Sequence, residues 1–206
     1  MGEDFIDGHP SALILGDNIF CGEGLTRKML QAVQQNIGAT LFAYYVNDPW
    51  NYGVLELDSN RTPVSIEEKP SNPRSSYAVT GLYFYDSNVC QYARPIKPSA
   101  RGDLEITDIN RIYLEQGRIN VKLMGRGFAW MGAGTHDSFL EASNFVATLE
   151  RRQGLKIACP EEIAFRQGLI DEDQLIKISS KLGHNGYRQY LLRLADPDNK
   201  YISSED

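Results

Sequence analysis

The stretch YAVTGLYFYD, residues 77–86, is rich in aromatic and β-branched residues, as a central strand of a sheet should be. Further strand-like runs lie on both sides of it, at 12–15, 39–46, 52–57, 63–69 and 119–124. Apolar residues at helical spacing predict helices over 25–33 and 106–116, the second ended by Gly117. Because strands and helices alternate, this part of the chain is predicted to fold as an α/β domain.

From Asp137 to Leu194 the pattern is helical only. Asp137 is expected to cap a first helix, Pro160 to occupy the first position of a second, and Asp171 to open a third. The last residues, DPDNKYISSED, are polar and are expected to fray. We therefore expect an α/β core over 1–136 and a helical C-terminal region over 137–206.

Composition limits the classes of function. A net charge of -6 argues against a nucleic-acid or membrane-surface partner, although a few local cations could still hold an anionic substrate. No apolar run approaches the length of a membrane span, and the charged N-terminus MGEDFIDGHP does not resemble a signal peptide. Cys21, Cys90 and Cys159 are far apart and odd in number, which favours reduced thiols and a cytoplasmic location.

Five stretches carry side chains suited to chemistry. In SALILGDNIFCG (11–22) an apolar strand ends at Asp17, a common position for a metal ligand in α/β enzymes. NDPWNYGVLELD (47–58) places Gly53 before a strand, where a ligand could approach the backbone. GRGFAWMGAGTH (125–136) is glycine-rich and contains Trp130 but no acid, and it resembles the wall of a site. An ordinary loop remains an equal alternative for residues 47–58 taken alone.

The fourth stretch, SIEEKP (65–70), favours a sugar phosphate as ligand. On strand alternation Glu68 faces away from Glu67 and Lys69. A carboxylate can accept bonds from sugar hydroxyls, and a nearby ammonium can neutralise a phosphate. Arg101, in RGDLEITDIN (101–110), precedes a predicted helix whose N-terminus could help to hold that phosphate. A solvated strand end and helix-start acids are the simpler alternatives for these two segments.

Several motifs in order resemble those of the bacterial glucose-1-phosphate thymidylyltransferases, which belong to the sugar-nucleotidyltransferases. They are LGDNIF (15–20), YGV (52–54), EEKP (67–70), YAVTGLYFYD (77–86), ARGDLEITDINRIYLEQG (100–117), GRGFAW (125–130), EASNF (141–145) and CPEEIAFRQG (159–168). The resemblance extends from about residue 2 to about residue 194. It implies a Rossmann-like mixed sheet with helices on both faces and a helical C-terminal extension. It also implies Mg²⁺ dependence, a homotetramer and a role in dTDP-rhamnose synthesis.

In that family the phosphate oxygen of glucose 1-phosphate attacks the α-phosphorus of dTTP, giving dTDP-glucose and pyrophosphate. By motif, Asp17 matches the metal ligand, and Asp17, Lys69 and Arg101 are the implied catalytic residues. The implied substrate-binding residues are Tyr52, Gly53, Glu68, Lys69, Val79, Arg101 and Trp130. A weaker match places Arg126, Glu162 and Arg166 at a second, regulatory nucleotide site.

The sequence departs from the family pattern in two ways. The family's Gly-rich GxGTRL loop, which holds the dTTP, does not occur here, so the chain is expected to be truncated at its N-terminus. The family's WxDTGT motif is WMGAGT (130–135), which leaves Gly132 where a second metal-binding aspartate belongs. A cloned fragment would explain only the first departure, whereas a decayed or repurposed paralogue would explain both.

Two functions therefore remain open. The chain is a glucose-1-phosphate thymidylyltransferase, or it is an inactive paralogue that binds sugar phosphate or serves as an assembly module. Truncation would also expose the sheet edge beside 12–15, so we expect association into an oligomer or poor solubility.

Overall fold

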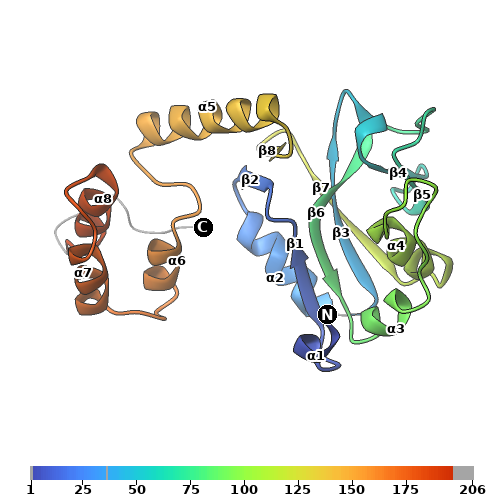
Figure 1. Ribbon diagram of the computed structural model, residues 1–206, viewed down its shortest axis with the longest axis horizontal. Coiled ribbons are helices and arrows are strands. Elements are labelled where there is room, and N and C mark those ends of the chain that lie inside the picture. The colour runs from blue at the N-terminus through green and yellow to red at the C-terminus, as the bar shows by residue number, and fades with distance from the viewer. Residues whose placement is uncertain (1, 36, 197–206) are drawn as a thin grey trace. The chain divides into compact units, whose positions relative to one another are not determined.

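The computed structural model describes residues 2–35 and 37–196 (Figure 1). It divides into two compact units, Met1–Gly134 and Thr135–Asp206. The division falls two residues before the boundary that the sequence predicts. Each unit is described by itself.

Unit 1 contains a mixed six-stranded sheet. Its strands are β1 (Ser11–Ile14), β3 (Ala39–Tyr45), β4 (Gly53–Leu57), β5 (Pro63–Glu68), β6 (Tyr77–Tyr85) and β7 (Ile119–Met124). The order is β5-β4-β6-β3-β7, and β1 pairs with β6 beyond the end of β4. β3 and β7 are parallel, and the other pairs are antiparallel. β6 pairs with three strands, which confirms it as the central strand.

Helices lie on both faces of this sheet, as expected (Figure 1). The helices of unit 1 are α1 (Glu3–Ile6), α2 (Leu25–Gln35), α3 (Val89–Ala93) and α4 (Ile106–Glu115), with a 3₁₀ turn at Pro49–Asn51. One buried cluster packs Ala32 of α2 against Phe42 and Leu82, and another packs Tyr113 of α4 against Leu41. Since adjacent strand residues point to opposite faces, the sheet is buried on both sides.

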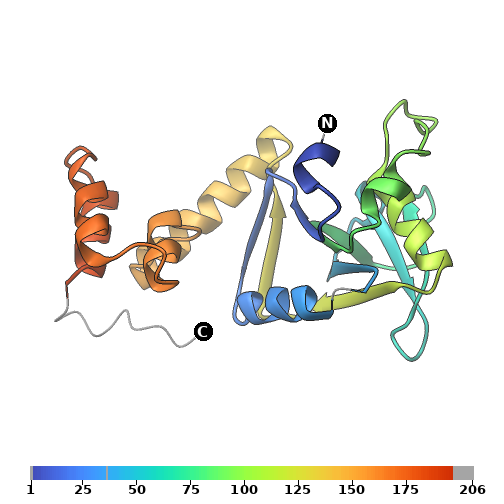
Figure 2. The same cartoon turned by 90° about the horizontal axis from the view of Figure 1, so that it is seen from below.

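A second, two-stranded sheet was not predicted. β2 (Asn18–Gly22) pairs antiparallel with β8 (Phe128–Gly132), and Asn18 lies opposite Gly132 (Figure 2). Each strand is short, and all ten residues are partly exposed, so neither shows the alternation that marks a strand. The pairing joins the turn after β1 to the glycine-rich stretch before residue 136.

A buried polar network surrounds Asp86, the residue that follows the C-terminal end of β6. Asp86 is 6% exposed and forms a 2.5 Å ion pair with Arg118. Its carboxylate also accepts hydrogen bonds from Tyr113 Oη at 2.8 Å and from Gly38 N at 3.0 Å. Because β3, α4 and β7 all begin or end beside these residues, the network ties three elements to β6.

Unit 2 is helical, as predicted. Its helices are α5 (His136–Gln153), α6 (Pro160–Arg166), α7 (Glu172–Ser180) and α8 (Gly186–Leu194). Tyr190 and Leu191 of α8 pack on Leu175 of α7, and all three are fully buried. None of the helices in the described ranges is long and apolar enough to cross a membrane.

The predicted helix starts in unit 2 are partly correct. Pro160 occupies the start of α6, and Asp171 caps α7, where its carboxylate accepts a bond from Gln174 N at 2.8 Å. Asp137 does not cap α5, however. Thr135 does so by accepting a bond from Ser138 N at 3.1 Å, because its extended backbone places it just outside the helix. The predicted fraying of the tail concerns residues 197–206, outside the described part of the chain.

Candidate functional site

Four elements of unit 1 converge on one point of the sheet. Gly53 opens β4 and is paired in register with Glu68, the last residue of β5. A Cβ placed on Gly53 would lie 3.2 Å from Thr107 Oγ1, 3.3 Å from Glu68 Oε2 and 3.9 Å from Val79 Cβ. The structure therefore brings together Gly53, Glu68 and Val79, three of the residues predicted to bind the substrate, and adds Thr107 from the start of α4; their role in binding stays a prediction. A side chain at position 53 would fill the space where these groups meet.

Glu68 is oriented by a neighbour and approached by a cation. Thr107 Oγ1 donates a 2.5 Å hydrogen bond to Glu68 Oε2, and Arg101 Nη1 lies 3.8 Å from Glu68 Oε1. The other guanidinium nitrogens of Arg101 lie 3.5 Å from Asp103 Oδ2 and 3.9 Å from Glu105 Oε1. One arginine thus faces three carboxylates and remains 43% exposed, which leaves it accessible to an anion.

The same carboxylate affects a buried tyrosine. Burial raises the pKa of Tyr83, on β6, well above its usual value, and the charge of Glu68 raises this pKa further. The Tyr83 hydroxyl therefore stays protonated.

Lys69 follows Glu68 in an unusual backbone conformation. Its φ is +42°, in the left-handed region that non-glycine residues rarely adopt. Its N–H donates to Tyr52 O at 2.9 Å, so the backbone of Lys69 joins the end of β5 to the residue before β4. The exposed Lys69 side chain starts from this bend. Strained residues of this kind concentrate at functional sites.

Aromatic side chains line the site near Tyr52. The rings of Tyr52 and Trp130 lie with centroids 5.0 Å apart, and Tyr44 meets Trp130 edge-on at 6.1 Å. Burial, followed by the charge of Asp48, raises the pKa of Tyr52, so its phenol remains neutral. β8 thereby brings Trp130 to the Tyr52 end of the site.

Asn18 connects this aromatic wall to Asp17. Its Oδ1 accepts a 2.6 Å hydrogen bond from Trp130 Nε1 and a 3.3 Å bond from Gly81 N. Its Nδ2 donates to Asp17 Oδ1 at 2.7 Å. The Asn18 side chain can lie this close to β6 only because residue 81 is a glycine, since a Cβ on Gly81 would lie 2.8 Å from the Asn18 amide. One amide thus fixes both the indole and the carboxylate.

Asp17 has few neighbouring side chains that could help it to bind magnesium. Its backbone O accepts from Ala133 N at 2.7 Å, so β8 holds Asp17 beside positions 132–134. A Cβ on Gly132 would meet nothing within 4 Å. Within the described residues, no group of three or more His, Cys, Asp or Glu side chains could hold a metal. Mg²⁺ is often held by one or two carboxylates together with substrate phosphates and waters. Asp17 supplies one such carboxylate, the smallest number that a protein provides at sites of this kind.

The residues expected at a regulatory site lie in both units. Arg126 is exposed in the turn between β7 and β8 of unit 1, whereas Glu162 and Arg166 pair at 2.8 Å within α6 of unit 2. Glu162 also accepts a hydrogen bond from Tyr190 Oη. Their joint role in nucleotide binding stays a prediction.

Sequence reasoning missed Thr107 and Asn18 as members of the site. Both lie within stretches singled out for other residues, beside Asp17 and within RGDLEITDIN. Asn18 follows the apolar run directly, and a side chain at the start of a strand could have been considered with Asp17. No pattern marks Thr107, because its partner Glu68 lies 39 residues away.

Comparison with known proteins identifies the class. The profile of the nucleotidyl transferase family matches residues 1–148, and the chain belongs to this family. A UDP-glucose pyrophosphorylase structure in complex with UDP-glucose has a TM-score of 0.64 at 22% identity, covering 71% of this chain and 59% of that one. At this identity the likeness shows the fold alone.

The more similar relatives are glucose-1-phosphate thymidylyltransferases, which confirms the resemblance seen in the motifs. The Xanthomonas campestris pv. campestris (strain B100) enzyme is 53% identical over 195 residues, 95% of this chain and 66% of the relative. The Mycobacterium tuberculosis (strain H37Rv) enzyme is 50% identical over 196 residues, 95% of this chain and 68% of the relative. A Bacillus anthracis structure assigned to the same activity, in complex with a sucrose, has a TM-score of 0.62 at 44% identity, covering 70% of this chain and 57% of that one. The chain thus spans about two thirds of the length of the curated relatives it matches.

Proposed function

We propose that this chain serves the glucose-1-phosphate thymidylyltransferase reaction and that its own part is to bind and orient glucose 1-phosphate. The convergence of Gly53, Glu68, Val79 and Thr107 carries the proposal. It combines a backbone without a side chain at Gly53 and a Glu68 carboxylate oriented by the Thr107 hydroxyl, and such a carboxylate can accept hydrogen bonds from sugar hydroxyls. Arg101 and Lys69 lie at the same end of β5 and supply cations for the phosphate.

In the proposed reaction, a phosphate oxygen of glucose 1-phosphate forms a bond to the α-phosphorus of dTTP. The bond from that phosphorus to the bridging oxygen breaks, and pyrophosphate leaves with the bonding electrons. No protein atom forms a covalent bond, so catalysis consists of positioning and charge neutralisation. Here Glu68 and the Gly53 backbone orient the sugar, while Arg101 and Lys69 reduce the repulsion between the two anions.

Asp17 is the residue that would hold Mg²⁺, oriented by the Asn18 amide. When bound, the ion would neutralise negative charge on the phosphates of the substrates. The Trp130 indole, held by its hydrogen bond to Asn18, provides an apolar surface beside Tyr52.

Substitution of Glu68 tests sugar binding. Titration calorimetry with glucose 1-phosphate should show that Glu68→Gln weakens binding about tenfold or more, because hydrogen bonds to a charged group contribute about 1.5–3 kcal/mol. Glu67→Gln is the matched control, since Glu67 is exposed and points to the opposite face. The proposal would be contradicted if both variants lost the same affinity for glucose 1-phosphate, or if Glu68→Gln left the affinity unchanged.

A second candidate is a binding module that does not catalyse transfer. Gly132 favours it, because the position opposite Asn18 carries no carboxylate. Pyrophosphate release from dTTP and glucose 1-phosphate with Mg²⁺ distinguishes the two candidates. Turnover by this chain excludes the binding module, whereas tight glucose 1-phosphate binding without turnover supports it.

The proposal extends to the setting of the reaction. Supply of dTDP-glucose for dTDP-rhamnose, a cytoplasmic location and a homotetramer accompany the proposed activity. All three cysteines are free thiols, as is usual in the reducing cytoplasm.

A further inference from the structure

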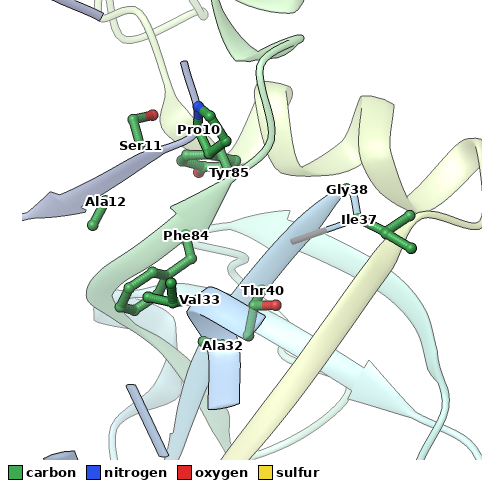
Figure 3. Close-up of a pocket in the computed structure, with 10 residues that line it drawn as sticks. All are labelled: Pro10, Ser11, Ala12, Ala32, Val33, Ile37, Gly38, Thr40, Phe84 and Tyr85. Carbon is green, nitrogen blue, oxygen red and sulfur yellow. The ribbon is translucent and has the colours of Figure 1, made fainter. Parts of the chain in front are cut away.

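An exposed cation distinguishes the Glu68 end of the sheet from the pocket beside β1. The pocket has a volume of about 130 Å³ and lies between Ala12 of β1 and Val33 of α2 (Figure 3). Its lining residues carry no charge, so a phosphate would find no counterion among them. Arg101, in contrast, is 43% exposed and has Nη1 3.8 Å from Glu68 Oε1. The contacts that hold this guanidinium in place therefore affect how the site binds an anion.

Arg101 lies on a short turn that comes before α4. Ser99 N donates to Asp103 O at 2.8 Å, and Gly102 N donates to Ser99 O at 2.9 Å. Gly102 has a φ of +86°, in the left-handed region that glycine adopts without strain. Residues 99–103 therefore form a closed turn from which the exposed Arg101 side chain starts.

One carboxylate oxygen is linked to both the backbone and the side chain of Arg101. Ser99 Oγ accepts a 3.2 Å hydrogen bond from Arg101 N and donates a 2.9 Å bond to Glu105 Oε1. The same Glu105 oxygen lies 3.9 Å from Arg101 Nε. The Glu105 side chain is only 12% exposed, so water screens this contact less than the contact to Asp103, which is 67% exposed. Glu105 therefore restricts where the guanidinium can lie.

Glu105 is available for these contacts because its side chain does not cap its own helix. It occupies the N-cap position of α4, and its backbone O accepts from Asp108 N at 3.1 Å, but its carboxylate forms no capping hydrogen bond. Two residues later, Thr107 Oγ1 donates to Glu68. The start of α4 thus holds two charged groups of the candidate site, Arg101 through Glu105 and Glu68 through Thr107.

We propose that Glu105 is a positioning residue, which acts through Ser99 and the guanidinium to keep Arg101 directed at the phosphate of glucose 1-phosphate. This role rests on the proposed binding of glucose 1-phosphate beside Glu68. The two acids next to Arg101 then differ in the sign of their effect. Asp103, an exposed carboxylate, repels the phosphate and lowers the affinity, whereas Glu105 raises the affinity by holding Arg101 in position.

Titration calorimetry with glucose 1-phosphate measures this difference in sign. Glu105→Ala should weaken binding about tenfold, as expected for the loss of a hydrogen-bonded charged group. Asp103→Ala is the matched control and should strengthen binding up to about threefold, because it removes an exposed negative charge beside the guanidinium. Unchanged or stronger binding by Glu105→Ala, or an equal loss in both variants, would overturn the proposal.

A second set of variants guards against misfolding of the Glu105→Ala chain. Ser99→Ala removes the hydroxyl that links Glu105 to the Arg101 backbone and retains the carboxylate. It should weaken binding about threefold, and the double variant should bind no more weakly than Glu105→Ala, since both changes break one network. Glu105→Gln keeps an acceptor for Ser99 and should recover part of the loss. Fully additive losses from Ser99→Ala and Glu105→Ala would overturn the proposal.

Arginine labelling tests the role of Glu105 without the sugar phosphate. Phenylglyoxal modifies accessible guanidinium groups, and mass spectrometry of the peptides gives the rate at Arg101. In the ligand-free protein, Glu105→Ala should speed this labelling about threefold, the factor expected from loss of one partly exposed ion pair, and Asp103→Ala should speed it less. Equal rates in wild type and Glu105→Ala would overturn the role of Glu105 alone. Absence of glucose 1-phosphate binding by wild type would instead overturn the proposed function on which that role rests.

Discussion

At the scale of single residues, Asp86 gives a pH-dependent prediction. Burial acts to raise the pKa of its carboxyl group, but hydrogen bonds from Tyr113, Asn88 and Gly38 outweigh burial and hold the pKa below its ordinary value. A lowered native pKa stabilises the fold above the unfolded pKa, near 4, and this stabilisation is lost as pH falls through the native value. No sequence pattern indicates this network, because Arg118 lies 32 residues from Asp86.

Asp86→Asn should lower the free energy of unfolding at pH 7 by about 1.5–3 kcal/mol, because hydrogen bonds to a charged group contribute about that much, while Arg118, whose side chain is 34% exposed, can still be hydrated. The difference from wild type should shrink below about pH 4, where wild type also loses the charge. Glu3→Gln, which breaks the exposed pair with Arg94, should change the free energy of unfolding far less than Asp86→Asn, because water screens an exposed ion pair. Urea unfolding at several pH values measures the free energy of unfolding of wild type and both variants. If the difference between wild type and Asp86→Asn did not depend on pH, the lowered pKa of Asp86 would be contradicted.

Glu68 shows where residue-level reasoning succeeds. Its orientation away from Glu67 follows from strand alternation, and Glu68 indeed points toward Gly53. Thr107, its hydrogen-bond partner, could not be predicted, because the contact depends on where the first turn of α4 lies against β5.

At the scale of elements, helix caps show why one start was predicted and another was not. Asp171 and Gln174 form a reciprocal pair of bonds, and an acid followed three residues later by glutamine is a recognisable start signal. Thr135 and Ser138 form the same arrangement at α5, but serine at the third position is a weak signal. Asp137 therefore looked like the cap, although it lies inside the first turn.

Asp171→Ala should destabilise α7 by about 1 kcal/mol, because it leaves the Gln174 N–H without its acceptor. Hydrogen exchange of the α7 amides measures the effect in the intact chain. Asp173→Ala, in the same first turn, removes only a charge near the helix dipole and should cost less, about 0.3–1 kcal/mol. If Asp173→Ala destabilised α7 more than Asp171→Ala does, the prediction for the Asp171 cap would be contradicted.

At the scale of the whole molecule, the pairing of β2 with β8 brings together residues 112 apart in sequence. Directly opposed residues of an antiparallel pair share a face, so a side chain at position 132 would lie on the face of Asn18. A Cβ at position 132 would meet nothing within 4 Å, whereas a Cβ on Gly134 would lie 3.3 Å from Asp17 Oδ2. The structure therefore has room for the second carboxylate that the family motif contains.

Gly132→Asp should raise the affinity for Mg²⁺ roughly tenfold in the presence of glucose 1-phosphate, because ligand charge tunes the affinity for divalent cations. Titration calorimetry measures the change. Gly125→Asp, in the open turn before β8, adds the same charge away from Asp17 and should have no effect. An equal gain in Mg²⁺ affinity from the two variants would indicate nonspecific attraction.

The sequence by itself determined the α/β class, the central strand at 77–85, the helical C-terminal region and the family, because periodicity and motifs are local properties of the chain. Only the tertiary structure decided which residues meet. It joined Thr107 to Glu68, Asn18 to both Trp130 and Asp17, and Asp86 to Arg118. These contacts depend on packing between segments far apart in sequence, which no local pattern encodes.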